Sequence, residues 1–126
     1  MKIEMKERER GVEPPVLLLD VTEEGTGAWV LSAAFYFTDD YAYAIKAFAD
    51  GDGYMAAQVP FHAWKNVLDE VIQIISEEIE EEMKAAEELG TFTDLVFCIE
   101  VNDKSLRHMA EKIIVTIQRK YPDLFQ

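Results

Sequence analysis

A single apolar stripe that follows Pro60 limits the folds open to this chain more than any other feature. Hydrophobic residues recur at steps of three and four from Phe61 to Ala86, and Leu89-Gly90 supplies a suitable helix end with glycine in the left-handed cap. Pro60 itself suits a first helical turn, where its missing N–H is not needed. A helix of this length spans roughly 40 Å, whereas a domain of this size has a radius of gyration near ~14 Å. We therefore expect one long helix that crosses the whole domain and overhangs it.

Four segments with strand character precede this helix, at residues 16–22, 28–38, 42–49 and 54–59. Turn signals separate them, and Asp50-Gly51-Asp52-Gly53 is the strongest, because these residues tolerate the positive φ of a tight hairpin. Residues 93–101 form a further strand that is apolar on both faces, which indicates a central position. Residues 104–121 are amphipathic, with an N-cap offered by Asn102-Asp103, and predict a second helix.

These elements predict an α+β fold. We expect an antiparallel β-meander of four to five strands with two helices packed on one face, in the order ββββαβα. No linker interrupts the pattern, so residues 1–126 are expected to form a single domain. Residues 1–14 are either an edge strand or a flexible arm, since apolar and charged residues alternate there before Pro14-Pro15.

The composition excludes several classes of protein. Hydrophobic residues make up 49% of the chain and charged residues 29%, which is typical of a globular protein. The single cysteine, Cys98, excludes an internal disulfide, and its apolar surroundings predict a buried, inert thiol. We therefore expect a cytoplasmic protein. The N-terminus lacks the apolar segment of a signal peptide, and the longest uncharged stretch, residues 25–38, is too short for a membrane helix.

The net charge of −13 is distributed unevenly. Residues 11–60 and residues 61–90 each carry −7, whereas residues 91–126 are neutral and residues 1–10 carry +1. Such a field repels phosphate backbones and anionic membranes, and it attracts basic surfaces. We therefore expect neither direct nucleic-acid binding nor membrane binding.

The most unusual feature is an acidic ridge on the long helix. Its members are Glu77, Glu78, Glu80, Glu81, Glu82, Glu87 and Glu88. Like charges at i,i+4 and acids near a helix C-terminus both destabilise a helix, and the pair Glu80–Lys84 offsets only part of this. Ile79 and Met83 continue the apolar stripe through the ridge, so one face is expected to remain packed.

Two explanations of the ridge stay open. It can face the basic residues of the second helix in the same or another subunit, namely Lys104, Arg107, Lys112, Arg119 and Lys120. Alternatively it binds an external partner, imitating the charge of a nucleic acid in the basic groove of a nucleic-acid-handling protein.

The meander supplies a second candidate surface, because neither of its faces is properly polar. Two helices can cover only one face, and the other then exposes alanines and tyrosines suited to a flat interface. The candidates for an oligomer interface are Val30, Ala34, Tyr36, Tyr43 and Tyr54. A two-fold homodimer is the simplest use of this face. The alternative is a half-barrel that buries both faces itself.

The sequence contains no catalytic, phosphate-binding or dinucleotide-binding motif, so we predict no catalytic residue, no cofactor and no enzymatic activity. His62 and His108 lie far apart without the cysteines or histidines that zinc requires. Acidic residues at two turns, Asp39, Asp40, Asp50 and Asp52, raise the question of a cation. Turn chemistry alone explains them, and no metal site is predicted.

Four strands followed by a long helix, joined through Val59-Pro60-Phe61-His62-Ala63-Trp64, resemble whirly-type single-stranded DNA-binding domains. That resemblance implies a basic groove on the sheet. The meander instead carries one base, Lys46, against the eight acids of residues 11–60. The charge therefore opposes the binding that the resemblance implies.

Two functions follow from these patterns. The first is a non-enzymatic, acidic protein-binding module that inhibits a nucleic-acid-handling protein through the ridge. The second is a homo-oligomeric structural or chaperone-like protein whose sheet face forms the subunit interface.

Overall fold

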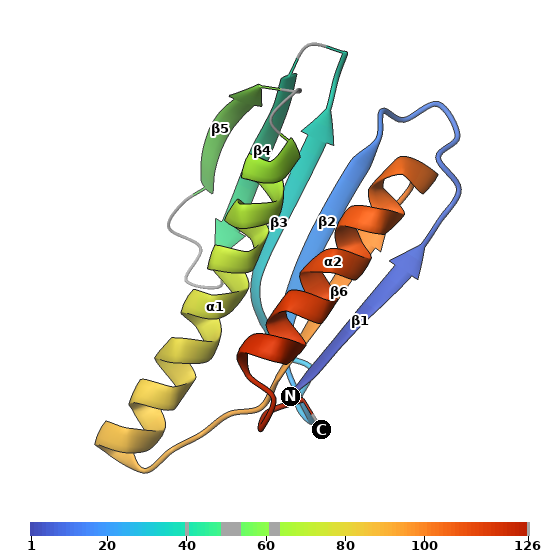
Figure 1. The fold of residues 1–126 in the computed structure, drawn as a ribbon. Helices are drawn as coiled ribbons and strands as arrows, with labels where there is room; N and C mark the ends of the chain where they lie inside the picture. The colour runs from blue at the N-terminus through green and yellow to red at the C-terminus, as the bar shows by residue number, and fades with distance from the viewer. Residues whose placement is uncertain (40, 49–53, 61–63, 126) are drawn as a thin grey trace.

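The computed structural model describes residues 1–39, 41–48, 54–60 and 64–125, and for residues 48, 54–60, 64 and 65 it describes the backbone alone. The elements in chain order are β1 (Lys2–Glu7), β2 (Val16–Glu23), β3 (Trp29–Phe37), β4 (Tyr41–Phe48), β5 (Tyr54–Pro60), α1 (Trp64–Leu89), β6 (Leu95–Val101) and α2 (Lys104–Lys120). Figure 1 shows them as one sheet with two helices lying across it. The α+β class predicted from the sequence is confirmed.

The sheet has the strand order β1-β6-β2-β3-β4-β5 in the described part of the chain. Strands β2 to β5 form the predicted antiparallel meander. The expectation of a purely antiparallel sheet of four to five strands was wrong, because β1 is a sixth strand and pairs with β6 in parallel. β6 lies between β1 and β2, so the connection from β1 to β2 passes over the end of a strand that comes about 90 residues later. Local sequence patterns carry no record of such a distant pairing.

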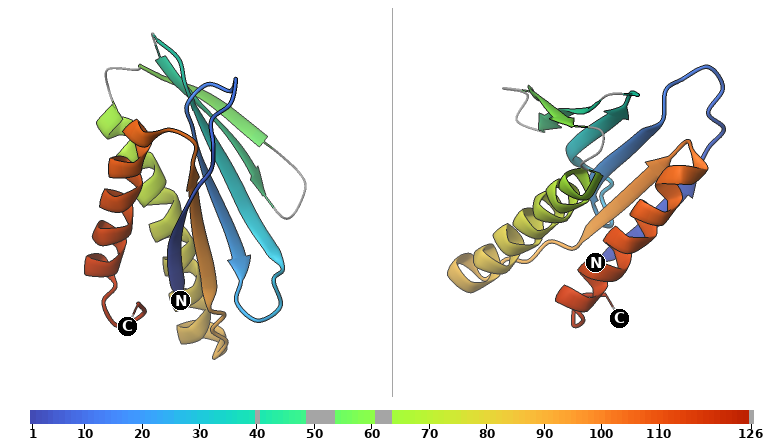
Figure 2. Two further views of the ribbon diagram at one scale, coloured as in Figure 1. Left: turned by 90° about the vertical axis from the view of Figure 1, so that its right-hand side faces the viewer. Right: turned by 45° about the horizontal axis from the view of Figure 1, so that its top comes forward.

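Both helices lie on one face of the sheet, as Figure 2 shows most clearly in its left view. The core forms between them and the sheet because alternate strand residues point towards the helices. Its largest fully buried side chains are Phe35, Phe37, Phe97, Leu17, Leu19, Ile75, Ile79, Leu95, Ile99, Leu106, Ile113 and Ile117. The opposite face, called the open face below, is covered by no element of the described chain. The half-barrel alternative, in which the meander buries both of its faces, is not observed, since Ile45 on the open face is 39% exposed and Asp20 is exposed.

Several predicted helix and turn signals act as expected. Gly90 has φ of 69°, and its N–H donates to the carbonyl of Ala86 over 3.1 Å, so α1 ends in the predicted left-handed cap. Asp103 caps α2 by accepting from the backbone N–H of Ser105 at 2.9 Å. The expectation for Pro60 was wrong. It ends β5, opposite Tyr41, at the outer edge of the sheet, where a residue without N–H is tolerated.

Candidate protein-binding surfaces

The C-terminal part of α1 projects to one side of the sheet, beyond the end of α2 (Figures 1 and 2). The apolar stripe of α1 is buried as far as Ile79, but Met83 is 46% exposed. The prediction that Met83 keeps one face packed was therefore wrong, because the helix has by then left the sheet. Leu89 and Phe92 are also exposed. We call residues 81–92 the α1 tip, a surface that carries both exposed apolar and exposed acidic side chains.

The glutamates of the ridge divide into two groups. Four have a place within the fold. Glu77 accepts from Gln73 at 3.0 Å, Glu80 from the hydroxyl of Tyr121 at 3.0 Å, and Glu82 from the backbone N–H of Thr93 at 3.1 Å, while Glu78 is half-buried. Glu81, Glu87 and Glu88 are exposed on the α1 tip. The expected Glu80–Lys84 ion pair is not formed, since Glu80 turns towards α2 instead.

Glu78 is the carboxylate most affected by its surroundings. Partial burial against the sheet disfavours its charged form and raises its pKa to about 7, and repulsion from Glu81, Glu82 and Glu77 adds to this effect. It lines a small hollow of about 50 Å³ together with Leu31, Ala33, Lys46, Ile74 and Glu77. The ammonium of Lys46 in this hollow is bonded to Glu70. The charged form of Glu78 is thus disfavoured by its surroundings, and this residue belongs to the packed part of α1.

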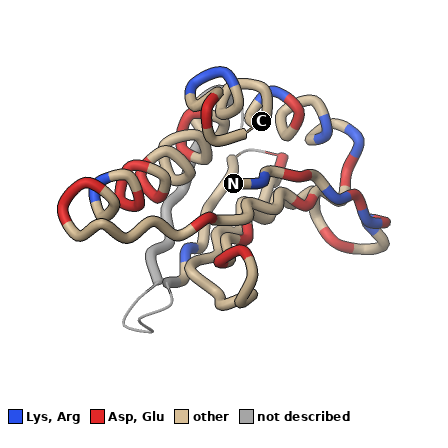
Figure 3. The backbone as a smooth tube through the Cα atoms, turned by 90° about the horizontal axis from the view of Figure 1, so that it is seen from below, with Lys and Arg blue, Asp and Glu red and all other residues tan. Residues whose placement is uncertain are grey.

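The basic residues of α2 do not neutralise the ridge within this chain. Figure 3 shows acids along α1 and bases along α2 on neighbouring helices. Yet Arg107 pairs with Glu7 and Glu111, at 3.1 and 3.2 Å, and Lys120 donates to the hydroxyl of Ser76 at 3.1 Å. Among the described residues, no ion pair joins the ridge to α2. The intrachain explanation of the ridge therefore lacks the direct charge pairing that it requires.

The open face carries the oligomer-interface candidates. Val30, Ala34, Tyr36 and Tyr43 are all partly buried on β3 and β4, and the rings of Tyr36 and Tyr43 stack with centroids 5.1 Å apart. Tyr54 pairs with Ala47 through its backbone, and its side chain lies outside the described ones. Ile45 on the same face is 39% exposed. The structure therefore brings the described candidates together on one uncovered surface.

Cys98 also lies on the open face, so the expectation of a buried thiol was wrong. It is only half-buried because no helix covers this side of β6. This partial burial raises the pKa of the thiol. Lys6 opposes that effect, while Glu4, Glu100 and Asp20 add to it. The thiol is thus kept protonated in the middle of four charged neighbours.

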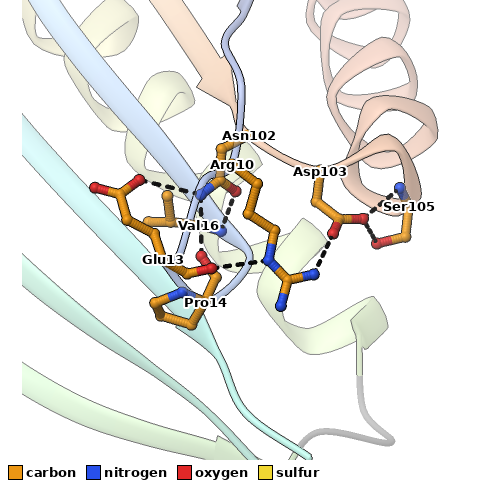
Figure 4. Close-up of polar contacts among 7 residues, drawn as sticks. All are labelled: Arg10, Glu13, Pro14, Val16, Asn102, Asp103 and Ser105. Carbon is orange, nitrogen blue, oxygen red and sulfur yellow. Dashed lines mark hydrogen bonds and ion pairs between the residues drawn. The ribbon is translucent and has the colours of Figure 1, made fainter.

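A polar cluster at one end of the sheet was not anticipated from the sequence (Figure 4). Asn102, 3% exposed, accepts from the backbone N–H of Val16 at 2.7 Å and donates to the carbonyl of Pro14 at 3.0 Å. Arg10 donates to the carbonyl of Glu13 at 2.8 Å and to Asp103 at 2.9 Å. These hydrogen bonds connect the segment between β1 and β2 to the turn that precedes α2.

A hollow of about 420 Å³ adjoins this cluster and is lined by Arg8, Arg10, Lys104 and their neighbours. Arg8 is paired with Glu13 at 2.9 Å and Glu100 at 3.1 Å, and Arg10 is paired with Asp103. Two of its three bases are therefore neutralised within the chain. We assign this cluster a structural role.

The remaining sequence-based candidates lie partly outside the described residues. His108 is exposed on α2, and His62 lies outside the described residues, as do Asp40, Asp50 and Asp52. Asp39 is exposed. Within the described ranges, no three histidine, cysteine or acidic residues are arranged to hold a metal ion. In the same ranges, no helix is both long and apolar enough to cross a bilayer.

No family model, curated protein or solved structure matches this chain. The resemblance to whirly-type domains therefore receives no support from these comparisons. The function has to be argued from the two surfaces described above.

Proposed function

We propose that this protein is a non-enzymatic binding module whose α1 tip engages a basic surface on another protein. The observation that carries the proposal is the exposure of Glu81, Glu87 and Glu88 on a helix end that projects from the fold without counter-charges from α2. Negative charges near a helix C-terminus oppose the helix macrodipole, and like charges three or four residues apart repel each other, so both weaken that helix. A partner that supplies lysine or arginine would remove this penalty on binding.

The α1 tip also limits what the partner looks like. Exposed Met83, Leu89 and Phe92 lie among its glutamates, so the complementary surface combines basic residues with apolar contacts. Basic grooves with hydrophobic or aromatic floors are typical of proteins that bind single-stranded nucleic acids. A helical row of carboxylates in such a groove would compete with phosphates, which makes a nucleic-acid-handling protein the proposed target and inhibition the proposed outcome.

The test is affinity capture from nuclease-treated native host lysate with three baits. The first is the unaltered protein, and the second carries Glu81→Lys, Glu87→Lys and Glu88→Lys. The third, a matched control, carries Glu9→Lys, Asp69→Lys and Asp123→Lys, all exposed and outside residues 81–92. Both variants change the net charge equally, so a general electrostatic effect appears in both.

We expect the unaltered and control baits to retain one basic protein that salt releases and single-stranded nucleic acid displaces. The tip variant should lose it by at least about tenfold, since several charge pairs at the interface reverse sign. Equal capture by the tip and control variants, or no displacement by nucleic acid, would contradict the proposal. Neither variant alters a hydrogen bond described above, and circular-dichroism spectra equal to that of the unaltered protein exclude a folding defect as the cause of lost capture.

A further inference from the structure

The open face of the sheet has a definite relief. At one end of β3 and β4 the stacked rings of Tyr36 and Tyr43 form a raised row, called the tyrosine row below. Beside it lies a hollow of about 400 Å³, with Ser32, Ala34 and Ala47 among the residues that line it. On this face of the sheet, Ala34 lies next to Tyr36 along β3, and the pair Ser32 and Ala47 follows it. The small side chains of these residues leave the sheet surface low. The tyrosine row and the hollow are therefore adjacent on one face.

The polar groups around this hollow complement the tyrosine row. Asp20, Glu100 and Lys6 line it. Asp20 accepts a hydrogen bond from the hydroxyl of Ser32, which in turn accepts one from the indole N–H of Trp29 at 2.7 Å. Phenol hydroxyls that enter the hollow would meet two carboxylates as acceptors, and buried tyrosine hydroxyls need such partners.

The open face is also nearly neutral in the described part of the chain. Its strands place two lysines, Lys2 and Lys6, against three carboxylates, Glu4, Asp20 and Glu100, which gives −1 of the total of −13. Two copies can therefore approach through this face with little repulsion, whereas approach through α1 brings two acidic helices together.

The area is sufficient for a stable complex. Six strands spaced about 4.8 Å apart, each contributing about seven residues of about 3.3 Å, give a face of roughly 650 Å². Two such faces together bury roughly 1,300 Å², which falls within the range of specific, stable interfaces.

We propose that the open face binds a second copy of this chain as a two-fold, face-to-face dimer, in which the tyrosine row of each copy occupies the hollow of the other. The two-fold axis lies in the plane of the interface and runs perpendicular to the strands. Rotation about this axis reverses the strand direction of the second copy relative to the first. The tyrosine row of each copy then lies over the hollow of the other. The contact buries Leu18, Ala34 and Ile45 from both copies and converts two open sheets into a sandwich. This surface is separate from the α1 tip, so a result that contradicts the dimer does not contradict the proposed partner binding, and the reverse also holds.

Sedimentation equilibrium between about 1 and 200 µM covers the affinities expected of weak to moderately strong dimers. The decisive variant is Ile45→Arg, which places a charge on the open face, and Val115→Arg is its matched control on the outer side of α2. The two residues are similarly exposed, at 39% and 42%. We expect a dimer for the unaltered protein and the control, and at least a 100-fold weaker association for Ile45→Arg. A monomer at all concentrations, or equal association of both variants, would overturn the proposal.

Cys98 provides a second readout that does not depend on a variant. It is half-buried on the open face and is the only cysteine of the chain. Its rate of alkylation at constant pH should fall at least about tenfold as the concentration rises through the dissociation constant of the dimer, because labelling then requires the free monomer. Tyr43→Ala should restore fast labelling without loss of the circular-dichroism spectrum. A dimer in which Cys98 reacts at the monomer rate would show that another surface is used.

Discussion

Asn102 shows how much depends on single polar side chains at the points where distant segments meet. Its amide bonds to Val16 and Pro14, so it joins the start of β2 to the turn after β6. An unsatisfied buried backbone N–H costs about 1–3 kcal/mol. A bonded asparagine at this position is therefore a substantial part of what holds the β1–β2 connection in place.

At Glu78 the prediction concerns pH. The pKa of Glu78 in the folded state is raised to about 7 from its ordinary value of 4.5, so the folded state binds a proton more tightly than the unfolded state. Its penalty on folding is therefore absent below the unfolded pKa and grows as pH rises through about 7. We predict that Glu78→Gln raises the free energy of unfolding at about pH 8 and leaves it nearly unchanged near pH 4.5. Urea denaturation at both pH values measures this difference.

The size of this effect is limited by solvent. The full shift corresponds to about 3 kcal/mol, but screening at a half-exposed carboxylate reduces it, and we expect about 1 kcal/mol. Glu81→Gln is the matched control, since Glu81 is exposed on the same helix. The explanation by burial fails if both variants stabilise the protein equally, because then only general repulsion is relieved.

These residues differ in how far their roles could be predicted from the sequence. Asp103 could be assigned as an N-cap because capping is a local rule, and the structure confirms that assignment. Asn102 offers the same side-chain oxygen, yet it serves a contact across 86 residues. Glu78 is one of seven similar glutamates, and only its distance from the sheet sets it apart. Local rules find caps and turns, but they cannot identify a partner that the fold supplies.

On the scale of elements, α1 consists of an N-terminal half that packs on the sheet and a C-terminal half whose charges disfavour the helical conformation. Burial up to Ile79 anchors the helix, whereas Glu87 and Glu88 oppose the macrodipole in the last turns. We predict that the double variant Glu87→Lys, Glu88→Lys stabilises the end of α1 by about 1 kcal/mol, since each lysine replaces a repulsive interaction by an attractive one. Amide hydrogen exchange of residues 83–89 should slow accordingly.

The same charge change at Glu9 and Asp123 is the control, since neither belongs to α1. It should leave exchange in residues 83–89 unchanged. If the lysines at the α1 tip speed up exchange there, the glutamates contribute to local stability, and the argument that they are retained for binding loses its basis.

Most elements could be predicted from the sequence because their signals are local. The meander β2–β5, the long helix and the cap at Gly90 all follow from periodicity and turn residues. The parallel pairing of β1 with β6 could not be predicted, since it depends on which edge of the meander β6 joins. For the same reason the open face could be expected, but the position of Cys98 on it could not.

On the scale of the whole molecule, charge is separated by surface. The acids are concentrated on α1, the open face is nearly neutral, and α2 carries five bases, of which Arg107 pairs with Glu7 and Glu111. This separation is compatible with one surface for self-association and another for a basic partner. It also raises the question of whether self-repulsion acts over the whole molecule or only along α1.

The salt dependence of stability distinguishes repulsion over the whole molecule from repulsion along α1. The Debye length falls from about 10 Å at 0.1 M to about 3 Å at 1 M salt, so added NaCl should raise the urea midpoint of the unaltered protein. The tip variant and the remote control of the capture experiment both lower the net charge from −13 to −7, since each of three substitutions adds two charges. Because seven glutamates are crowded into residues 77–88 of α1, about three helical turns, we predict that only the tip variant loses most of its salt response. Equal losses in both would instead indicate that net charge, and not the arrangement of charge on α1, governs the stability of the fold.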